Sequence, residues 1–445
     1  MKIDEQTLRD LEIFNSPDKI SIFEKADRTI TKGGRQYLKY FFKNPLNNIT
    51  EIKERQLSFL YIIRKNWKIT IHNNQIYFIK NYLKSNISPI ESQNTLKIFL
   101  KGTTYLFRHK DSGLFNYYEY FKEGVEYIKG FLDLLNNIKK SINNDAPDPI
   151  KSIKTSLEKF FRITDIKKLY KSKIYNLSFI DIFYYDNVFR NKYKHQLYDV
   201  IKIFYEIDAL ISLKNFVDKY NLTYPVFIES ENPVLEINNV FHLMIKKPKK
   251  IDFKFQENKN FVFLTGPNMS GKTTLLKSIG LSVYLAHLGL GVPADYMKLT
   301  YFEELISDIN TRDNINRGYS YFFNEVRRVK NISSKISSNK RILVILDELF
   351  RGTNIKDAFD GTELVINGFT RWEKSLFILS SHLVELDKKI KKNPNIAFKY
   401  FDSQVINNKP HFNYILKNGV SKKRIGLLIL ENEEIPQILF QKEDR

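Results

Sequence analysis

The chain contains no cysteine and no long apolar run. Without cysteine it can form neither disulfides nor zinc–thiolate sites, which fits a reducing compartment such as the cytoplasm. Its longest apolar runs, such as Phe261–Leu264 and Ile342–Leu346, are far too short to span a bilayer, so we expect no membrane segment. The N-terminal residues MKIDEQTLRD are polar and acidic and do not resemble a signal peptide. We therefore expect a cytoplasmic protein.

Length and charge give the next limits. A chain of 445 residues, 42% of them apolar, is long enough for two or more packed domains. The net charge is +21, and both halves of the chain contribute to it. A polyanionic partner such as a nucleic acid would explain this excess. A composition rich in Lys, Asn and Ile, as an AT-rich genome produces, would explain it equally well, and charge alone leaves both open.

Helical periodicity dominates the first part of the chain. Thr50 is expected to cap a helix that continues through Ile63. Further on, apolar residues recur at alternating steps of three and four, the pattern of a long helix packed on another: Tyr118, Phe121, Val125, Ile128, Leu132 and Leu135. Two prolines in Asn144–Ile150 predict a loop between long helices. Residues 1–220 therefore read as a mostly α-helical domain.

The pattern changes near residue 220. Short apolar runs at Phe261–Leu264, Ile342–Leu346 and Leu376–Leu379 alternate with amphipathic helices, which predicts buried strands of a parallel α/β sheet. The segments YPVFIES (224–230) and FHLMI (241–245) are predicted to be short strands, and the segments on either side of INNKP (406–410) a hairpin. Residues 221–445 therefore form a second, α/β domain.

A glycine loop follows the first of these strands and precedes a helical pattern. Residues Gly266–Thr273 satisfy G-x-x-x-x-G-K-[ST], a P-loop whose backbone N–H groups surround phosphate oxygens at a helix N-terminus. Lys272 is expected to reach the β and γ phosphates, and Thr273 to ligate Mg²⁺. The candidate nucleotide-binding residues are Gly266, Pro267, Asn268, Met269, Ser270, Gly271, Lys272, Thr273 and Thr274.

Two acids end the second predicted strand, and a histidine follows the third. We call Asp347 and Glu348 the acid pair: Asp347 is expected to hold Mg²⁺ through water, and Glu348 to polarise an attacking water. A positioned base favours hydrolysis over phosphoryl transfer to a metabolite. His382 can hydrogen-bond the γ phosphate, although a histidine in such a place is often purely structural. Ser320 precedes a helical run and could bind an anion or simply cap the helix, and both readings stay open.

These motifs, in this order, resemble those of the MutS family of DNA mismatch-repair ATPases, within the ABC-type ATPases. The resemblance is carried by TGPNMSGK (265–272), by DELFRGT (347–353), by SSH (380–382), and by GVS (419–421) with GL (426–427). Upstream, LEIFNS (11–16), DRTITKGGRQYL (27–38) and NPL (44–46) are similar to the start of the family's helical core and lever domain.

The resemblance implies a fold and a function. It implies an ABC-type P-loop ATPase domain preceded by a core/lever domain, ATP and Mg²⁺ as cofactors, and DNA (duplex, mismatched or branched) as partner. It also implies a homodimer through the ATPase domains. In that dimer Gly318 and Ser320 reach the partner's γ phosphate, Asn354 lies on the segment joining the two sites, and Asn268 helps position the phosphates. The function implied is an ATP-dependent DNA clamp in repair or recombination control.

Two residues depart from the family pattern, and two modules are not expected. Tyr319 stands where an arginine is common and Phe350 where a glycine is usual. We expect a short member with a reduced clamp insertion, without the N-terminal mismatch-recognition domains and without a C-terminal Smr nuclease module, and hence without nuclease activity. An ATPase acting on ribosomes or structured RNA is the alternative. An ABC-type ATPase driving an unrelated partner is a third reading.

Overall fold

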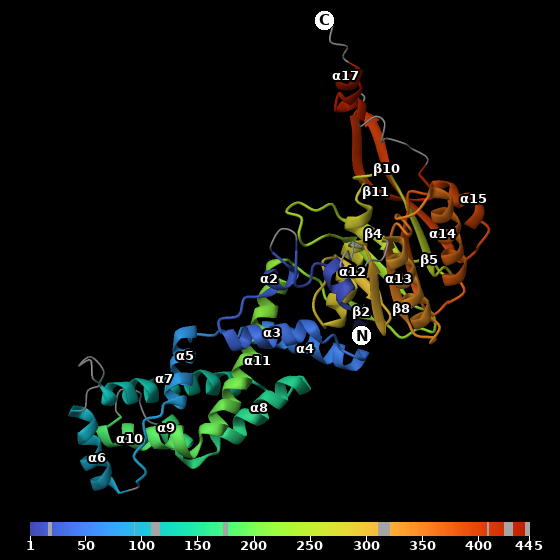
Figure 1. Ribbon diagram of the computed structural model, residues 1–445. Helices are drawn as coiled ribbons and strands as arrows, with labels where there is room; N and C mark the ends of the chain where they lie inside the picture. The colour runs from blue at the N-terminus through green and yellow to red at the C-terminus, as the bar shows by residue number, and fades with distance from the viewer. Residues whose placement is uncertain are drawn as a thin grey trace, which may run out of the picture. The chain divides into compact units, whose positions relative to one another are not determined.

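The structure is a computed structural model that describes residues 1–16, 20–92, 94–107, 116–171, 177–309, 321–406, 409–421 and 430–440 (Figure 1). The contacts within the chain divide it into two compact units. One comprises residues 1–25, 44–53 and 217–445, and we call it the α/β unit. The other comprises residues 26–43 and 54–216, and we call it the helical unit.

The helical unit consists of helices, drawn in blue to green in Figure 1. They are α3 (Lys32–Lys43), α4 (Ile49–Lys65), α5 (Asn73–Lys84), α6 (Thr95–Phe107), α7 (Tyr117–Ser141), α8 (Asp148–Phe161), α9 (Thr164–Lys171), α10 (Phe179–Asn187) with the π-helical turn Val188–Lys192, and α11 (Lys194–Lys219). No helix in the described residues combines the length and the apolar character that crossing a membrane requires.

The helix α7 confirms the predicted apolar stripe. Five of its six residues are buried, namely Phe121, Val125, Ile128, Leu132 and Leu135. The predicted loop is also confirmed, since α7 ends at Ser141 and α8 begins at Asp148. The predicted cap at Thr50 is wrong. Helix α4 already begins at Ile49, because the side chain of Asn48 accepts the N–H of Glu51 at 2.8 Å.

A seven-stranded sheet is the centre of the α/β unit. Its order is β1 (Lys2–Ile3), β7 (Glu304–Asp308), β8 (Ile342–Asp347), β9 (Leu376–Ser380), β5 (Phe261–Thr265), β10 (Ile396–Ile406) and β11 (Lys409–Asn418). All neighbours pair in parallel except β10 and β11, which form an antiparallel hairpin. The three predicted buried strands and the predicted hairpin are thus confirmed. Every residue of β5, β8 and β9 is buried, as a sheet covered on both faces requires.

Helices cover the sheet. On one face α13 (Tyr321–Ile336), α14 (Ile355–Phe369) and the short α15 (Asp387–Ile390) close an apolar core with the inward side chains of the strands. Helix α12 (Lys272–His287) packs against β7, β8 and β9. It also packs against β3 of a second sheet, ordered β2 (Val226–Phe227), β6 (Tyr296–Leu299), β3 (Leu235–Val240) and β4 (Ile251–Lys254). The predicted strand at residues 241–245 is wrong, since β3 ends at Val240 and a turn follows.

The N-terminal residues belong to the α/β unit. They form β1, α1 (Glu5–Asp10) and α2 (Ile22–Ala26). The Asp10 carboxylate accepts hydrogen bonds from the Ser307 hydroxyl at 2.6 Å and from the Ile309 N–H at 3.0 Å. Glu12 pairs with Lys277 of α12 at 2.7 Å. These contacts tie residues far apart in sequence to the same sheet. At the other end of the chain, α17 (Ile435–Phe440) is the last described element.

A buried ion pair stabilises the helical unit. Asp186 accepts hydrogen bonds from the Arg190 guanidinium at 2.5 and 2.6 Å and from the Tyr82 hydroxyl at 2.7 Å, and all three side chains are buried. Removing one partner of such a pair leaves the other charge buried without compensation.

Asp186→Ala should therefore lower the free energy of unfolding by about 3–5 kcal/mol. Urea denaturation of the whole chain measures the change. The control is Asp199→Ala, which breaks the exposed pair with Lys202 and should cost less than about 0.5 kcal/mol. Equal losses in the two variants would contradict the role given to the buried pair.

Candidate functional site

The glycine loop turns between β5 and α12 in a way that requires its glycines. Gly266 has φ +150° and Gly271, which directly precedes α12, has φ +97°. A Cβ on Gly266 would lie 2.9 Å from the Ser270 hydroxyl, and one on Gly271 would lie 3.2 Å from the Tyr414 ring. Met269 also has a positive φ, +65°, and its side chain is exposed. The loop therefore presents backbone N–H groups at the N-terminus of a long helix, a ready site for an anion.

Lys272 lies inside this loop. Its ammonium group donates to the carbonyl oxygens of Gly266 at 2.8 Å and Pro267 at 3.1 Å, and lies 3.4 Å from His382 Nε2. Burial lowers the pKa of Lys272, and the carboxylates of the acid pair oppose that effect. The positive charge of Lys272 thus lies where the backbone N–H groups of the loop would meet phosphate oxygens.

The loop and the acid pair are joined directly. The Thr273 hydroxyl donates to Asp347 Oδ2 at 2.6 Å. The second carboxylate oxygen of Asp347 and the hydroxyls of Ser270 and Ser380 are buried without a hydrogen-bond partner in the described part of the chain. Buried polar atoms are nearly always paired, so unpaired ones around the glycine loop and the acid pair indicate where a ligand completes the site.

Glu348 is held from two sides. One carboxylate oxygen lies 2.8 Å from His382 Nε2 and the other 2.9 Å from the Nε of Arg351. Burial alone would raise the pKa of Glu348, but His382, Arg351 and Lys272 together hold it below its usual value. The carboxylate is therefore ionised at neutral pH, as a group that orients and activates water must be.

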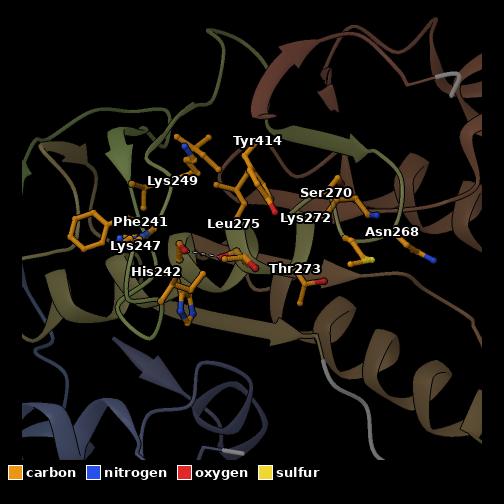
Figure 2. A pocket seen from close by; sticks show the side chains of 18 of the residues that line it. Phe241, His242, Lys247, Lys249, Asn268, Ser270, Lys272, Thr273, Leu275 and Tyr414 are labelled. Carbon is orange, nitrogen blue, oxygen red and sulfur yellow. Dashed lines mark hydrogen bonds between the residues drawn. The ribbon is translucent and has the colours of Figure 1, made fainter. Parts of the chain in front are cut away.

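A cavity of about 450 Å³ lies beside these groups (Figure 2). Residues of the glycine loop, Glu348 and His382 line part of it. The rest of the lining includes residues that sequence reasoning missed: Phe241, His242, Ile245, Lys247, Lys249 and Tyr414. Tyr414 comes from β11, and the others from the segment between β3 and β4, of which residues 241–245 were predicted to be a strand. Burial lowers the pKa of His242 to about 4, so its imidazole is neutral.

The cavity matches a nucleotide in chemistry. Its size falls in the range of about 300–1,000 Å³ usual for small-molecule sites. The glycine loop offers a cation and backbone N–H groups for phosphates. Phe241, Ile245 and Tyr414 offer aromatic and aliphatic side chains for a base, and Lys247 and Lys249 add two further cations. Thr273 and Asp347, with its unpaired oxygen, fit Mg²⁺, which needs one or two protein ligands beside water and phosphate oxygens. No cluster of three or more metal-binding side chains occurs in the described residues.

The remaining predicted residues divide between the cavity and other places. Gly318 and Ser320 lie outside the described residues. Asn354 is the N-cap of α14: its side chain accepts the N–H of Asp357 at 2.9 Å and donates to the Asp357 carboxylate at 2.6 Å. Asn268 and Thr274 line the cavity. Arg351 was missed as a site residue although DELFRGT contains it, because nothing in the sequence showed that its side chain folds back onto Glu348.

Comparisons with known proteins agree with the order of the motifs. A family model described as MutS domain III matches residues 6–213, and one described as MutS domain V matches residues 262–444. The chain is similar to proteins named DNA mismatch repair protein MutS from Phocaeicola vulgatus (29% identical over 251 residues), Bacteroides fragilis (30% over 251) and Carboxydothermus hydrogenoformans (32% over 203). These matches cover 53%, 53% and 44% of this chain. They cover 28%, 28% and 24% of the relatives, so the matched part spans less than a third of their length.

Gly271→Ala tests the geometry of the loop. The added methyl group meets a left-handed backbone and the Tyr414 ring, so the affinity for a fluorescent ATP analogue should fall by about tenfold or more. The control is Gly130→Ala in α7, where an added Cβ meets nothing within 4 Å and affinity should stay unchanged. Equal affinities in the two variants would show that the analogue binds elsewhere.

Proposed function

This chain belongs to the MutS family, and from that premise we propose that it is a dimeric ATPase that couples ATP binding and hydrolysis to gripping DNA. The α/β unit then has the P-loop fold of ABC-type ATPases, and the helical unit forms the core and lever domain. The relatives' shared name, DNA mismatch repair protein, supports a role in repair or recombination control.

One observation carries the catalytic part of the proposal. Glu348, ionised and fixed between Arg351 and His382, shares a pocket with the ammonium group of Lys272. The loop N–H groups and Lys272 would hold the β and γ phosphates, and Glu348 would orient water for in-line attack. His382 would donate to the γ phosphate. Thr273 and Asp347 would hold Mg²⁺, which neutralises charge that develops on the phosphate oxygens.

The aromatic and aliphatic residues that line the pocket support a nucleotide with a purine base. Tyr414, Phe241 and Ile245 offer flat or aliphatic surfaces for stacking. Membership of the MutS family makes ATP the expected nucleotide.

Charge supports the nucleic-acid part of the proposal. A net charge of +21 favours phosphate contacts that do not depend on base sequence. In the proposed homodimer the ATPase domains face each other. Gly318, Ser320 and Asn354 of each subunit would complete the partner's site. The protein would act in the cytoplasm, on the nucleoid when bound to DNA.

Two substitutions separate ATP binding from hydrolysis. Glu348→Gln keeps the shape of the site but removes the base, so ATP affinity should persist while kcat falls by about 10²-fold or more. Lys272→Ala removes the phosphate-binding cation, so affinity should fall by about tenfold or more. Equilibrium titration and phosphate release measure the two effects. Retained full turnover in both variants would refute the site, and Lys202→Ala, at an exposed lysine of α11, is the control.

A binding panel tests the partner. Duplex, mismatched and branched DNA and ribosomes are each titrated with and without a non-hydrolysable ATP analogue, at two salt concentrations. DNA binding should depend on the analogue and weaken with salt, with a log–log slope of about −0.9 per phosphate contacted. Binding to ribosomes without binding to DNA would favour the RNA-acting alternative. No DNA binding at low salt would end the clamp proposal.

A further inference from the structure

The segment after the acid pair has an unusual backbone. Glu348 has φ +57° and Phe350 has φ +61°, so two non-glycine residues within three positions are left-handed. A bulky residue adopts this conformation only where the surrounding structure enforces it, and such residues concentrate at functional sites. The segment that carries Glu348 and Arg351 therefore needs support from neighbouring elements.

Glu325 of α13 supplies that support. Its carboxylate accepts the N–H of Arg351 at 3.3 Å and the N–H of Gly352 at 3.4 Å, one on each oxygen. The side chain is 2% exposed. A buried carboxylate that receives two backbone N–H groups fixes both peptide planes, because neither N–H has water as an alternative partner.

Phe350 anchors the same segment from the other side. Its ring is buried against Phe322 of α13, with the ring centroids 5.7 Å apart. It also covers Gly361 of α14, where an added Cβ would lie 3.0 and 3.1 Å from two ring atoms. Burial of this ring offsets the strain of the left-handed backbone at a position where the family usually has glycine.

Helix α13 is itself firmly placed. Arg328, one turn after Glu325, donates to the Asp4 carboxylate and to the Ser307 carbonyl, each at 2.5 Å. The helix is thereby tied to β7 and to α1. Glu325 thus holds the segment after the acid pair in place against helix α13.

We propose that Glu325 is a positioning residue for hydrolysis: it fixes the backbone of Arg351 and Gly352 so that the Arg351 guanidinium holds Glu348 in its working orientation. Glu325 accepts a hydrogen bond from the Arg351 backbone N–H, and the Arg351 Nε lies 2.9 Å from the Glu348 carboxylate. The Arg351 guanidinium also donates to the Asp347 carbonyl at 2.9 Å. This role rests on the proposed ATPase function, but its structural part can be measured without catalysis.

Two readouts on the whole chain test the proposal. In Glu325→Ala, kcat for ATP should fall by about tenfold or more while KM stays within about twofold, because nucleotide binding does not use Glu325. Hydrogen exchange at the Arg351 and Gly352 amides should accelerate by about tenfold or more. Glu325→Gln retains one acceptor oxygen, so it should fall between the wild type and Glu325→Ala in both readouts.

The matched control is Asp208→Asn in the helical unit. Asp208 is also buried and accepts two backbone N–H groups, those of Ile30 and Thr31, each at 2.9 Å. Asp208→Asn should lose comparable stability. Hydrogen exchange at the Arg351 amide and kcat should both stay at their wild-type values. If Glu325→Ala does not fold, Glu325→Gln decides.

The outcomes separate the two proposals. A folded Glu325 variant with wild-type exchange at Arg351 and Gly352 overturns the positioning role, as does changed exchange with unchanged kcat. If the wild-type chain hydrolyses no ATP, the proposed function fails. The exchange data still show whether Glu325 holds the segment, and unprotected amides in the wild type would refute that as well.

Discussion

The parallel pairing of β5, β8 and β9 is the constraint on which the site depends. Because the three strands run the same way, their carboxyl ends lie at one edge of the sheet, where ligands bind in open α/β folds. The pairing places Asp347 opposite Ser380, and the Glu348 N–H donates to the Ser380 carbonyl at 2.8 Å. Thr273 thus meets Asp347 across 74 residues, and Lys272 approaches His382 across 110.

Charge balance follows from that geometry. The carboxylates of the acid pair and the cations Lys272 and Arg351 lie at the same edge of the sheet. The Thr273 hydroxyl donates to one carboxylate, and backbone carbonyls accept hydrogen bonds from Lys272. Lys272 donates to carbonyl oxygens of its own loop. A phosphate oxygen is a stronger, charge-assisted acceptor and can take their place. The buried, unpaired oxygen of Asp347 leaves one further position to be filled. A charged ligand therefore completes the hydrogen bonds and the charge balance of the site.

Local patterns were enough to predict the strands that carry the loop, the acid pair and His382. Each motif reads from a few consecutive residues, and parallel pairing then brings the motifs together. The rest depends on contacts that no local pattern encodes. Tyr414 reaches the pocket from a hairpin, and Phe241 and Ile245 line the pocket instead of lying on a strand. Residues 1–25 join the α/β unit through Asp10 and Glu12, which sequence reasoning grouped with the helices.

The most direct measurement is the affinity of the whole chain for a non-hydrolysable ATP analogue, with and without saturating duplex DNA at low salt. Coupling between two sites is reciprocal for binding, so a clamp that closes on DNA with ATP must also bind ATP differently when DNA is present. DNA is expected to change the Kd of the analogue by about fivefold or more. A chain that binds both the analogue and DNA, with the same Kd for the analogue in the presence and absence of DNA, would contradict the proposed clamp.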